Sequence, residues 1–386
     1  MKNATWQYFT LEEYQGRLDA LRARMTEKGV DCMLVHTPEN LYYLTGYQTP
    51  GYYWYQTLIV PMDREPVFIT RLLENSNVEH LTWVEDSRPY GDSDDWVERT
   101  RETLENLGMG SKRIGVEMSS WFITIHDYDR LRGMLPDAKW VDCSMMVEEG
   151  RMIKSPKEIE YITQAARATE AGVLAGIEAS AVGATENEVA AEVHAAQIKA
   201  GSEYTGLPLF VTAGKRSFLG HVTWYRETIQ PGDTVFLEIS GCINRYHASQ
   251  MRNVYLGDPP EASVRATGVM AAALEEMIKF IRPGVTAHDA HMVCKNVIGE
   301  AGLGAELNHR AAYSIGIGFA PDWGEGHIIS MNEGERRELK AGMTFHLIPA
   351  IFIPGLTSVG VSETALVTET GCEPITGNVE RRLFSK

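Results

Sequence analysis

The first 150 residues alternate between amphipathic stretches and short, wholly apolar runs. After Thr10, helical periodicity begins at Leu11 and continues to about Gly29, so the threonine is a candidate N-cap. Four apolar runs that are too short for helices indicate buried strands: 32–36, 57–61, 66–70 and 113–117. Helical segments lie between them, which favours a mixed sheet covered by helices and hence an α/β domain.

A new domain is predicted to begin near residue 154. Ser155, Pro156 and Glu158 combine an N-cap serine, a proline at the first helical position and a glutamate at the third. The helix that this capping box opens is expected to run to about Ala179. We therefore divide the chain into an N-terminal domain, 1–153, and a C-terminal domain, 154–386.

The C-terminal domain contains a short internal repeat. Thr185 opens a helix that ends near Gly201, and Thr286 opens another that ends near Gly302, an offset of 101 residues. Each threonine has an acidic residue three positions later, as N-terminal caps often do. Duplication of a helix–helix–strand unit would give an α+β domain with pseudo-twofold symmetry and a site between its halves. Chance similarity over so short a stretch is the alternative.

Composition narrows the class of protein. The 386 residues carry a net charge of −16, which argues against nucleic acid or an anionic membrane surface as a partner. No apolar run approaches the length of a membrane span, and the first residues do not resemble a signal peptide. The five cysteines show neither disulfide nor metal-site spacing. These features predict a cytoplasmic protein with reduced thiols.

Two carboxylates stand out because they lie inside apolar strands. Glu238 falls within Val235–Ile239, where it shares a face with Phe236, and Glu363 lies within Val359–Val367. A carboxylate in such a strand is costly unless it is paired or functional. The alternative is a pair of structural carboxylates.

Three further groups of residues are candidates for a site. His221 is a candidate general base, since the unperturbed imidazole titrates near neutral pH. The aromatic run Tyr52, Tyr53, Trp54 and Tyr55 would attract a delocalised cation, or else form a hydrophobic core or interface. A polar, glycine-punctuated loop and one later strand supply the remaining candidates for substrate binding: Asp322, Trp323, Glu325, His327 and His346.

The segment Gly232–Gly257 resembles the strand pair that carries metal ligands in the superfamily of methionine aminopeptidases, prolidases and creatinases, whose C-terminal domain is the pita-bread fold. This resemblance extends from about residue 12 to 380. It places the five ligand positions at Glu238, Ser249, Ile315, Ile348 and Glu363. Two apolar residues and a hydroxyl do not bind a dinuclear metal centre, so neither a metal nor another cofactor is expected.

The resemblance also implies roles for other residues. His221 lies eleven residues before Gly232, a spacing that matches the catalytic histidine of creatinase. In that family the loop corresponding to Tyr52–Tyr55 reaches over the active site of the partner subunit. A homodimer in which each N-terminal domain covers the other subunit's site is therefore implied.

Within the superfamily, residues 318–331 and 343–349 most resemble ectoine hydrolases. These enzymes open the cyclic amidine of ectoine, a small zwitterion, to an N-acetylated 2,4-diaminobutyrate. The resemblance implies that Glu238 and Glu363 hold the amidinium and that His221 handles protons. Either water activated at His221 or the carboxylate of Glu238 attacks the amidinium carbon, and the sequence leaves both routes open.

Three other functions fit parts of the same pattern. A creatinase-like amidinohydrolase would act on another amidinium zwitterion, although Tyr55 stands near the place where creatinase offers an arginine. A metal-dependent Xaa-Pro peptidase would need the missing ligands. A non-catalytic pita-bread binding module would not need Glu238, Glu363 and His221 together.

Overall fold

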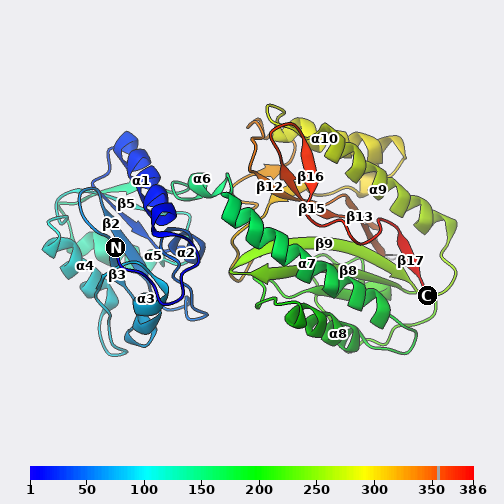
Figure 1. Ribbon diagram of the computed structural model, residues 1–386, viewed down its shortest axis with the longest axis horizontal. Coiled ribbons are helices and arrows are strands. Elements are labelled where there is room, and N and C mark those ends of the chain that lie inside the picture. Colours follow the sequence, from blue (N-terminus) through cyan, green and yellow to red (C-terminus); the bar gives the residue numbers. More distant parts are fainter. Residues whose placement is uncertain (354–356) are drawn as a thin grey trace. The chain divides into compact units, whose positions relative to one another are not determined.

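The computed structural model describes residues 1–353 and 357–386 and consists of two compact units, Met1–Arg151 and Met152–Lys386 (Figure 1). The predicted boundary lay between residues 153 and 154. No sheet is shared between the two units, and each unit has its own apolar core residues.

The first unit is built on a six-stranded mixed sheet in the order β4-β3-β2-β1-β5-β6. The strands are β1 Cys32–Val35, β2 Thr57–Pro61, β3 Val67–Ile69, β4 Asp86–Ser87, β5 Arg113–Val116 and β6 Lys139–Asp142. β1 pairs antiparallel with β2 and parallel with β5. The helices are α1 Leu11–Lys28, α2 Pro38–Thr45, the 3-10 turn η1 Leu72–Glu74, α3 Asn75–Leu81, α4 Trp96–Asn106, α5 Ile125–Met134 and α6 Glu148–Arg151.

Local chemistry fixes the ends of α1 where the sequence predicts them. The Thr10 side chain accepts a hydrogen bond from the backbone N–H of Glu13, and Gly29 ends the helix with φ 68°, in the left-handed region that glycine adopts without strain. The central strands β1 and β2 are buried along their whole length, as expected for apolar runs. The predicted mixed sheet with covering helices is confirmed.

The second unit contains a four-stranded sheet, a five-stranded sheet and a separate hairpin. One sheet has the strand order β17-β9-β8-β7 and the other the order β11-β10-β12-β15-β16, while β13 pairs with β14. The strands are β7 Phe210–Ala213, β8 Thr234–Ile243, β9 Tyr246–Tyr255, β10 Ala312–Ser314, β11 Ser330–Met331, β12 Thr344–Leu347, β13 Ala350–Ile353, β14 Thr357–Gly360, β15 Glu363–Val367, β16 Cys372–Pro374 and β17 Leu383–Ser385. Two 3-10 turns, η2 Gly214–Arg216 and η3 Gly304–Glu306, interrupt the connections.

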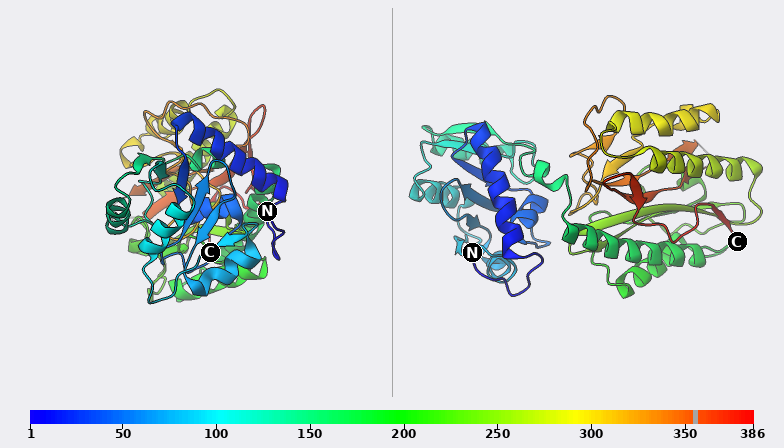
Figure 2. Two further views of the ribbon diagram at one scale, coloured as in Figure 1. Left: turned by 90° about the vertical axis from the view of Figure 1, so that its left-hand side faces the viewer. Right: turned by 45° about the horizontal axis from the view of Figure 1, so that its top comes forward.

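Four helices of this unit form the two pairs that the repeat predicts: α7 Pro156–Ala179 with α8 Glu186–Lys199, and α9 Glu261–Phe280 with α10 Ala287–Glu300. Figures 1 and 2 show one pair along each side of the strands. Thr185 and Thr286 cap the second helix of each pair through the backbone N–H of the residue three positions on. Ser155 and Glu158 form the predicted capping box at α7. The predicted fold class is thereby confirmed at the level of its elements.

All five cysteines are free thiols. Among residues 1–353 and 357–386, no helix is both long enough and apolar enough to cross a bilayer.

Candidate active site

A cavity of about 980 Å³ opens in the second unit. Its wall comes from β7, β8 and β9, from the segment 219–223, from the loop 321–330 and from residues around β10. The lining is aromatic and apolar with a small number of charged groups, which is typical of a site for a small molecule.

Glu238 contributes the carboxylate at the centre of this wall. It lies in the middle of β8, opposite Phe210 of β7 and Met251 of β9, and all three side chains line the cavity. The residue is only 9% exposed, and no described residue forms a hydrogen bond or ion pair with its carboxylate. Burial, with a smaller contribution from nearby Asp322, raises the pKa of Glu238 to about 8. The cavity therefore holds a carboxyl group without a partner among the described residues, and a bound cation would stabilise its ionised form.

His221 lies on the same cavity wall. It follows η2 in the chain, is exposed, and has φ 55°. Its ring centroid is 5.7 Å from that of Phe210, the residue paired with Glu238 across the two strands. The structure thus brings together the predicted base and the predicted carboxylate on one wall.

Tyr313 of β10 is a cavity residue that the sequence did not single out. Its hydroxyl accepts a hydrogen bond from Trp323 Nε1 at 2.8 Å, because an indole N–H only donates. The hydroxyl proton is then directed at His346 Nδ1, also at 2.8 Å, and His346 Nε2 donates to Ser362 Oγ at 2.7 Å. Burial lowers the pKa of His346 to about 3, so this imidazole is neutral. Of these four residues only Tyr313 and Trp323 line the cavity.

The loop that carries the other predicted binding residues divides into two sets. Asp322, Trp323 and His327 line the cavity. Glu325 does not: it is fully buried, forms an ion pair with Lys154 Nζ at 2.6 Å and accepts the backbone N–H of Ile317 at 3.2 Å. Glu325 and His346 were expected to bind substrate, but their positions support the wall from behind instead.

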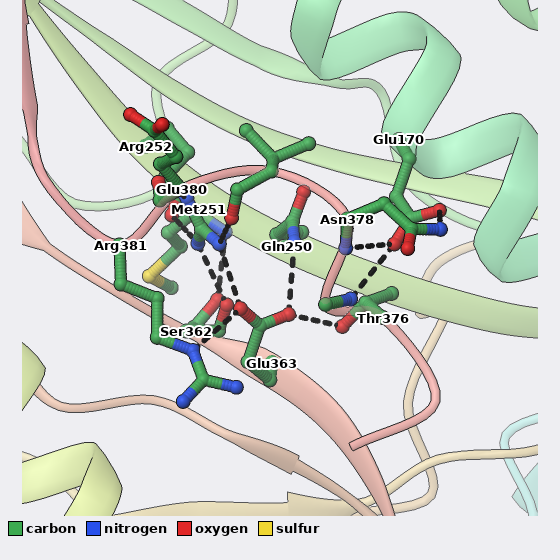
Figure 3. Close-up of polar contacts among 12 residues, drawn as sticks. Glu170, Gln250, Met251, Arg252, Ser362, Glu363, Thr376, Asn378, Glu380 and Arg381 are labelled. Carbon is green, nitrogen blue, oxygen red and sulfur yellow. Dashed lines mark hydrogen bonds and ion pairs between the residues drawn. The ribbon is translucent and has the colours of Figure 1, made fainter.

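Glu363 also differs from its expected role, as Figure 3 shows. It is fully buried and does not line the cavity. Its oxygens accept hydrogen bonds from Arg252 Nη2 at 2.6 Å, Gln250 Nε2 at 2.8 Å, Thr376 Oγ1 at 2.5 Å and Arg381 Nε at 3.1 Å. Two guanidinium groups and two neutral donors satisfy the carboxylate inside the protein, so this geometry gives no support to contact with a substrate.

The aromatic run of the first unit has a mixed environment. Tyr55 packs against the core, where its hydroxyl lies 3.0 Å from Thr100 Oγ1. Tyr52 has an edge contact with Phe122 at 5.6 Å, and the Arg71 guanidinium lies 4.5 Å from the Trp54 ring centroid. Tyr53 is 77% exposed. Tyr55 is thus a core residue, whereas Tyr53 is at the surface.

Two comparisons by family profile cover almost the whole chain. The profile of metallopeptidase family M24 matches residues 160–369, and that of the creatinase/prolidase N-terminal domain matches residues 17–153. The chain belongs to metallopeptidase family M24. The predicted membership of the creatinase and prolidase superfamily is confirmed.

Individual proteins that are similar to this chain are hydrolases. An ectoine hydrolase from Halomonas elongata is 29% identical over 98% of both chains, which confirms the resemblance to that group. An Xaa-Pro dipeptidase from Lactobacillus helveticus is 25% identical over 93% of this chain and 96% of the relative. The solved prolidase from Pyrococcus horikoshii, at 22% identity, has a TM-score of 0.85 and covers 95% of this chain and 100% of its own, so the pita-bread fold is shared.

The family name implies a metal centre, but the side chains of this M24 member do not fit one. Ser249 Oγ donates to Ser240 Oγ at 2.8 Å, and Ile348 presents an apolar side chain to the cavity. Ile315, which the resemblance places at another ligand position, is fully buried and does not line the cavity. Within residues 1–353 and 357–386, no three His, Cys, Asp or Glu side chains form a group that would hold an ion. Hard cations need several oxygen ligands, whereas the expected ligand positions 249, 315 and 348 offer one hydrogen-bonded hydroxyl and two apolar side chains.

Proposed function

We propose that this protein is a metal-independent hydrolase that opens the cyclic amidine ring of ectoine. The observation that carries the proposal is Glu238, a cavity carboxylate with no partner among the described residues. An amidinium ion would supply the missing charge and two N–H donors. The likeness to the ectoine hydrolase of Halomonas elongata supports the same class of substrate.

The cavity suits such a cation in two respects. Asp322 is a second acidic group on the same wall and contributes to the raised pKa of Glu238, so a bound cation would offset the repulsion between the two carboxylates. Phe210, Phe236 and Trp323 offer ring surfaces to a flat, charge-delocalised ring. An amidinium carbon is already electrophilic, so polarisation by a Lewis acid is not required.

Two routes to the product remain in the proposal. In the covalent route, a Glu238 oxygen bonds to the amidinium carbon, one ring C–N bond breaks, and the leaving amine takes a proton from His221. Water then adds to the same carbon and returns one proton to His221. The Glu238 carboxylate departs, the second water proton passes to the released amine, and the N-acetyl group stays on the other nitrogen. In the second route, His221 takes a proton from water, the hydroxide attacks the carbon, and the same proton returns to the leaving amine.

Other parts of the proposal concern the assembly. We infer a cytoplasmic homodimer in which the Tyr52–Trp54 segment of one subunit completes the site of the other. The free state of all five cysteines is compatible with a reducing compartment. The exposure of Tyr53 supports a surface that is available to a second subunit or a ligand.

Turnover with a substrate panel tests the function. Purified protein is mixed with ectoine, creatine or an Xaa-Pro dipeptide, and release of a primary amine or of the expected product is followed. We expect turnover of ectoine that resists chelators. Glu238→Gln should lower kcat/KM by more than about 10³-fold, and Thr163→Ala, an exposed helix substitution, serves as the matched control. Turnover of creatine alone, or of the dipeptide after metal addition, would refute the proposal.

Intact-protein mass spectrometry separates the two routes. The covalent route predicts a Glu238-dependent adduct in the first turnover. Attack by water predicts full turnover with no mass shift under the same rapid-quench conditions.

A further inference from the structure

Arg310 places a positive charge on the wall of the cavity that contains Glu238. It lies two residues before the start of β10 and is half-buried. Its guanidinium carbon lies 4.6 Å from the centre of the Tyr313 ring, and Nη1 donates to Ser330 Oγ at 3.2 Å. Among the described residues, no carboxylate lies within ion-pair distance of it. The charge is therefore oriented but not neutralised.

A second arginine on the same wall behaves differently. Arg337 lines the cavity too, but its guanidinium is paired with Glu335, with Nε 2.9 Å from Oε1 and Nη2 2.5 Å from Oε2. An arginine that is already bound to a carboxylate has little attraction left for an anionic ligand. Of the two arginines that line the described cavity, Arg310 is the one that a ligand would complete.

The surroundings of Arg310 hold its side chain in place. Ser330 Oγ, which accepts from Arg310, donates in turn to the Gly326 carbonyl at 2.8 Å. A Cβ at position 326 would collide with the guanidinium, so the glycine leaves the space that Arg310 occupies. The Tyr313 ring, the Ser330 hydroxyl and the space beside Gly326 therefore orient the guanidinium before a ligand binds. Such a guanidinium binds an anion at a lower entropic cost than a mobile guanidinium does.

An acidic group and a guanidinium thus line one cavity without forming an ion pair with each other. Among the described residues, Glu238 has no hydrogen-bond or ion-pair partner, and Arg310 has no carboxylate partner. Tyr313 is close to both, since Arg310 stacks on its ring and the Glu238 charge contributes to the raised pKa of its hydroxyl. A ligand with a single charge would complete only one of the two groups. A zwitterion would complete both.

We propose that Arg310 is the carboxylate receptor of this cavity and selects substrates that carry a carboxylate beside a delocalised cation. The inference rests on the proposed function, because it specifies how that site orients its substrate. With the carboxylate held at Arg310, the cationic carbon is directed to Glu238, and a substrate without the carboxylate loses this orientation.

Matched ligands test the role of Arg310 by calorimetry. Ectoine is compared with its ring lacking the carboxylate, 2-methyl-tetrahydropyrimidine, and creatine is compared with N,N-dimethylguanidine. In whichever pair the wild type binds, Arg310→Met should weaken binding of the ligand that carries the carboxylate, and the expected loss is about 100-fold. It should change binding of the ligand that lacks the carboxylate less than about threefold. Arg310→Lys should recover part of the loss, since it keeps the charge but not the fork of donors.

Arg336→Met is the matched control, because it removes an exposed arginine that does not line the cavity. It should leave all affinities within about threefold. Equal losses for both members of a pair in Arg310→Met would mean a structural role and overturn the inference. Unchanged binding in Arg310→Met would overturn it as well, while leaving the proposed function intact. Wild-type protein that binds neither pair would refute the proposed function itself.

Discussion

Glu238 is held in an environment that opposes its own charge. Burial raises its pKa to about 8, so at pH 6 the free protein keeps this carboxyl group protonated. An amidinium ligand needs the ionised form. The apparent affinity should therefore rise about tenfold per pH unit below pH 8 and level off above it, because each step increases the ionised fraction tenfold. Calorimetric titration with ectoine between pH 5.5 and 9.5 measures this profile.

The control for this profile is the neutral variant. Glu238→Gln should bind ectoine weakly, with little pH dependence over the same range, because the titrating group is gone. Proton release gives a second readout: wild-type protein at pH 7 should release nearly one proton per amidinium bound, measured in buffers of different ionisation enthalpy. A flat wild-type profile would show that another group receives the cation.

In contrast to Glu238, the buried imidazole of His346 has its hydrogen-bond partners within the protein. His346 accepts from Tyr313 through Nδ1 and donates to Ser362 through Nε2, so both nitrogens are occupied within the protein. Its pKa of about 3 keeps it neutral at every pH at which the enzyme is expected to work. A histidine in this state orients the Tyr313 hydroxyl but does not exchange protons with a substrate. His221, in contrast, lines the cavity, where a ligand can reach it.

At the scale of elements, the features predicted correctly are those set by local chemistry. The N-caps at Ser155, Thr185 and Thr286 need only a hydroxyl and a backbone N–H three residues later. The glycines at 183 and 284 have φ of 89° and 88°, which marks the turn before each repeated helix. Such signals lie within a few residues, so the sequence contains all the information that they need.

The sequence predicted less well which strand side chains point toward the cavity. In an extended chain, a shift of one residue moves a side chain to the opposite face. The sequence pattern favoured Glu363, but the side chain that reaches the network behind the cavity belongs to its neighbour Ser362. Tyr313 lines the cavity whereas Ile315, two residues further on and just beyond the end of β10, does not, and the alternation of strand faces does not predict this difference. Pairing between strands that are distant in the sequence decides the facing, and a single sequence does not report it.

The Glu363 cluster joins β9 to β15 and to the segment that follows β16. Arg252 and Glu363 are both fully buried, and the removal of one partner leaves an uncompensated charge. Glu363→Gln should therefore lower the free energy of unfolding by about 3–5 kcal/mol. In contrast, kcat/KM of the folded protein at low temperature should fall less than about tenfold, since the carboxylate does not line the cavity. Chemical denaturation and steady-state kinetics on the same preparation measure both quantities.

The matched variant for this test is Glu238→Gln, which should show the reverse pattern. It removes a carboxylate without a partner among the described residues, so stability should be retained or increased while catalysis is lost. If Glu363→Gln were as stable as wild type but lost more than about 10³-fold in kcat/KM, the carboxylate would act in catalysis as the sequence first suggested.

At the scale of the whole molecule, the two units contribute different kinds of surface. Every residue that lines the described cavity lies between 207 and 352, within the second unit. The first unit offers exposed aromatic groups at Tyr53 and Trp121, which are 77% and 76% exposed. Large exposed aromatic side chains are candidates for contact with a partner or ligand. In the proposed homodimer, these exposed side chains would be available for contact with the other subunit.

Hybrid dimers test whether one subunit's first unit serves the other subunit's cavity. One chain carries Glu238→Gln and the other Tyr53→Ala with Trp54→Ala; the two are co-expressed with different tags, and the mixed dimer is purified. If the aromatic loop acts on the partner's site, one of the two sites contains both an intact Glu238 and an intact loop. The hybrid should then recover about half of the wild-type activity, as twofold symmetry requires. If the loop acts within its own subunit, both sites are defective, and the hybrid should show no more activity than the loop variant alone.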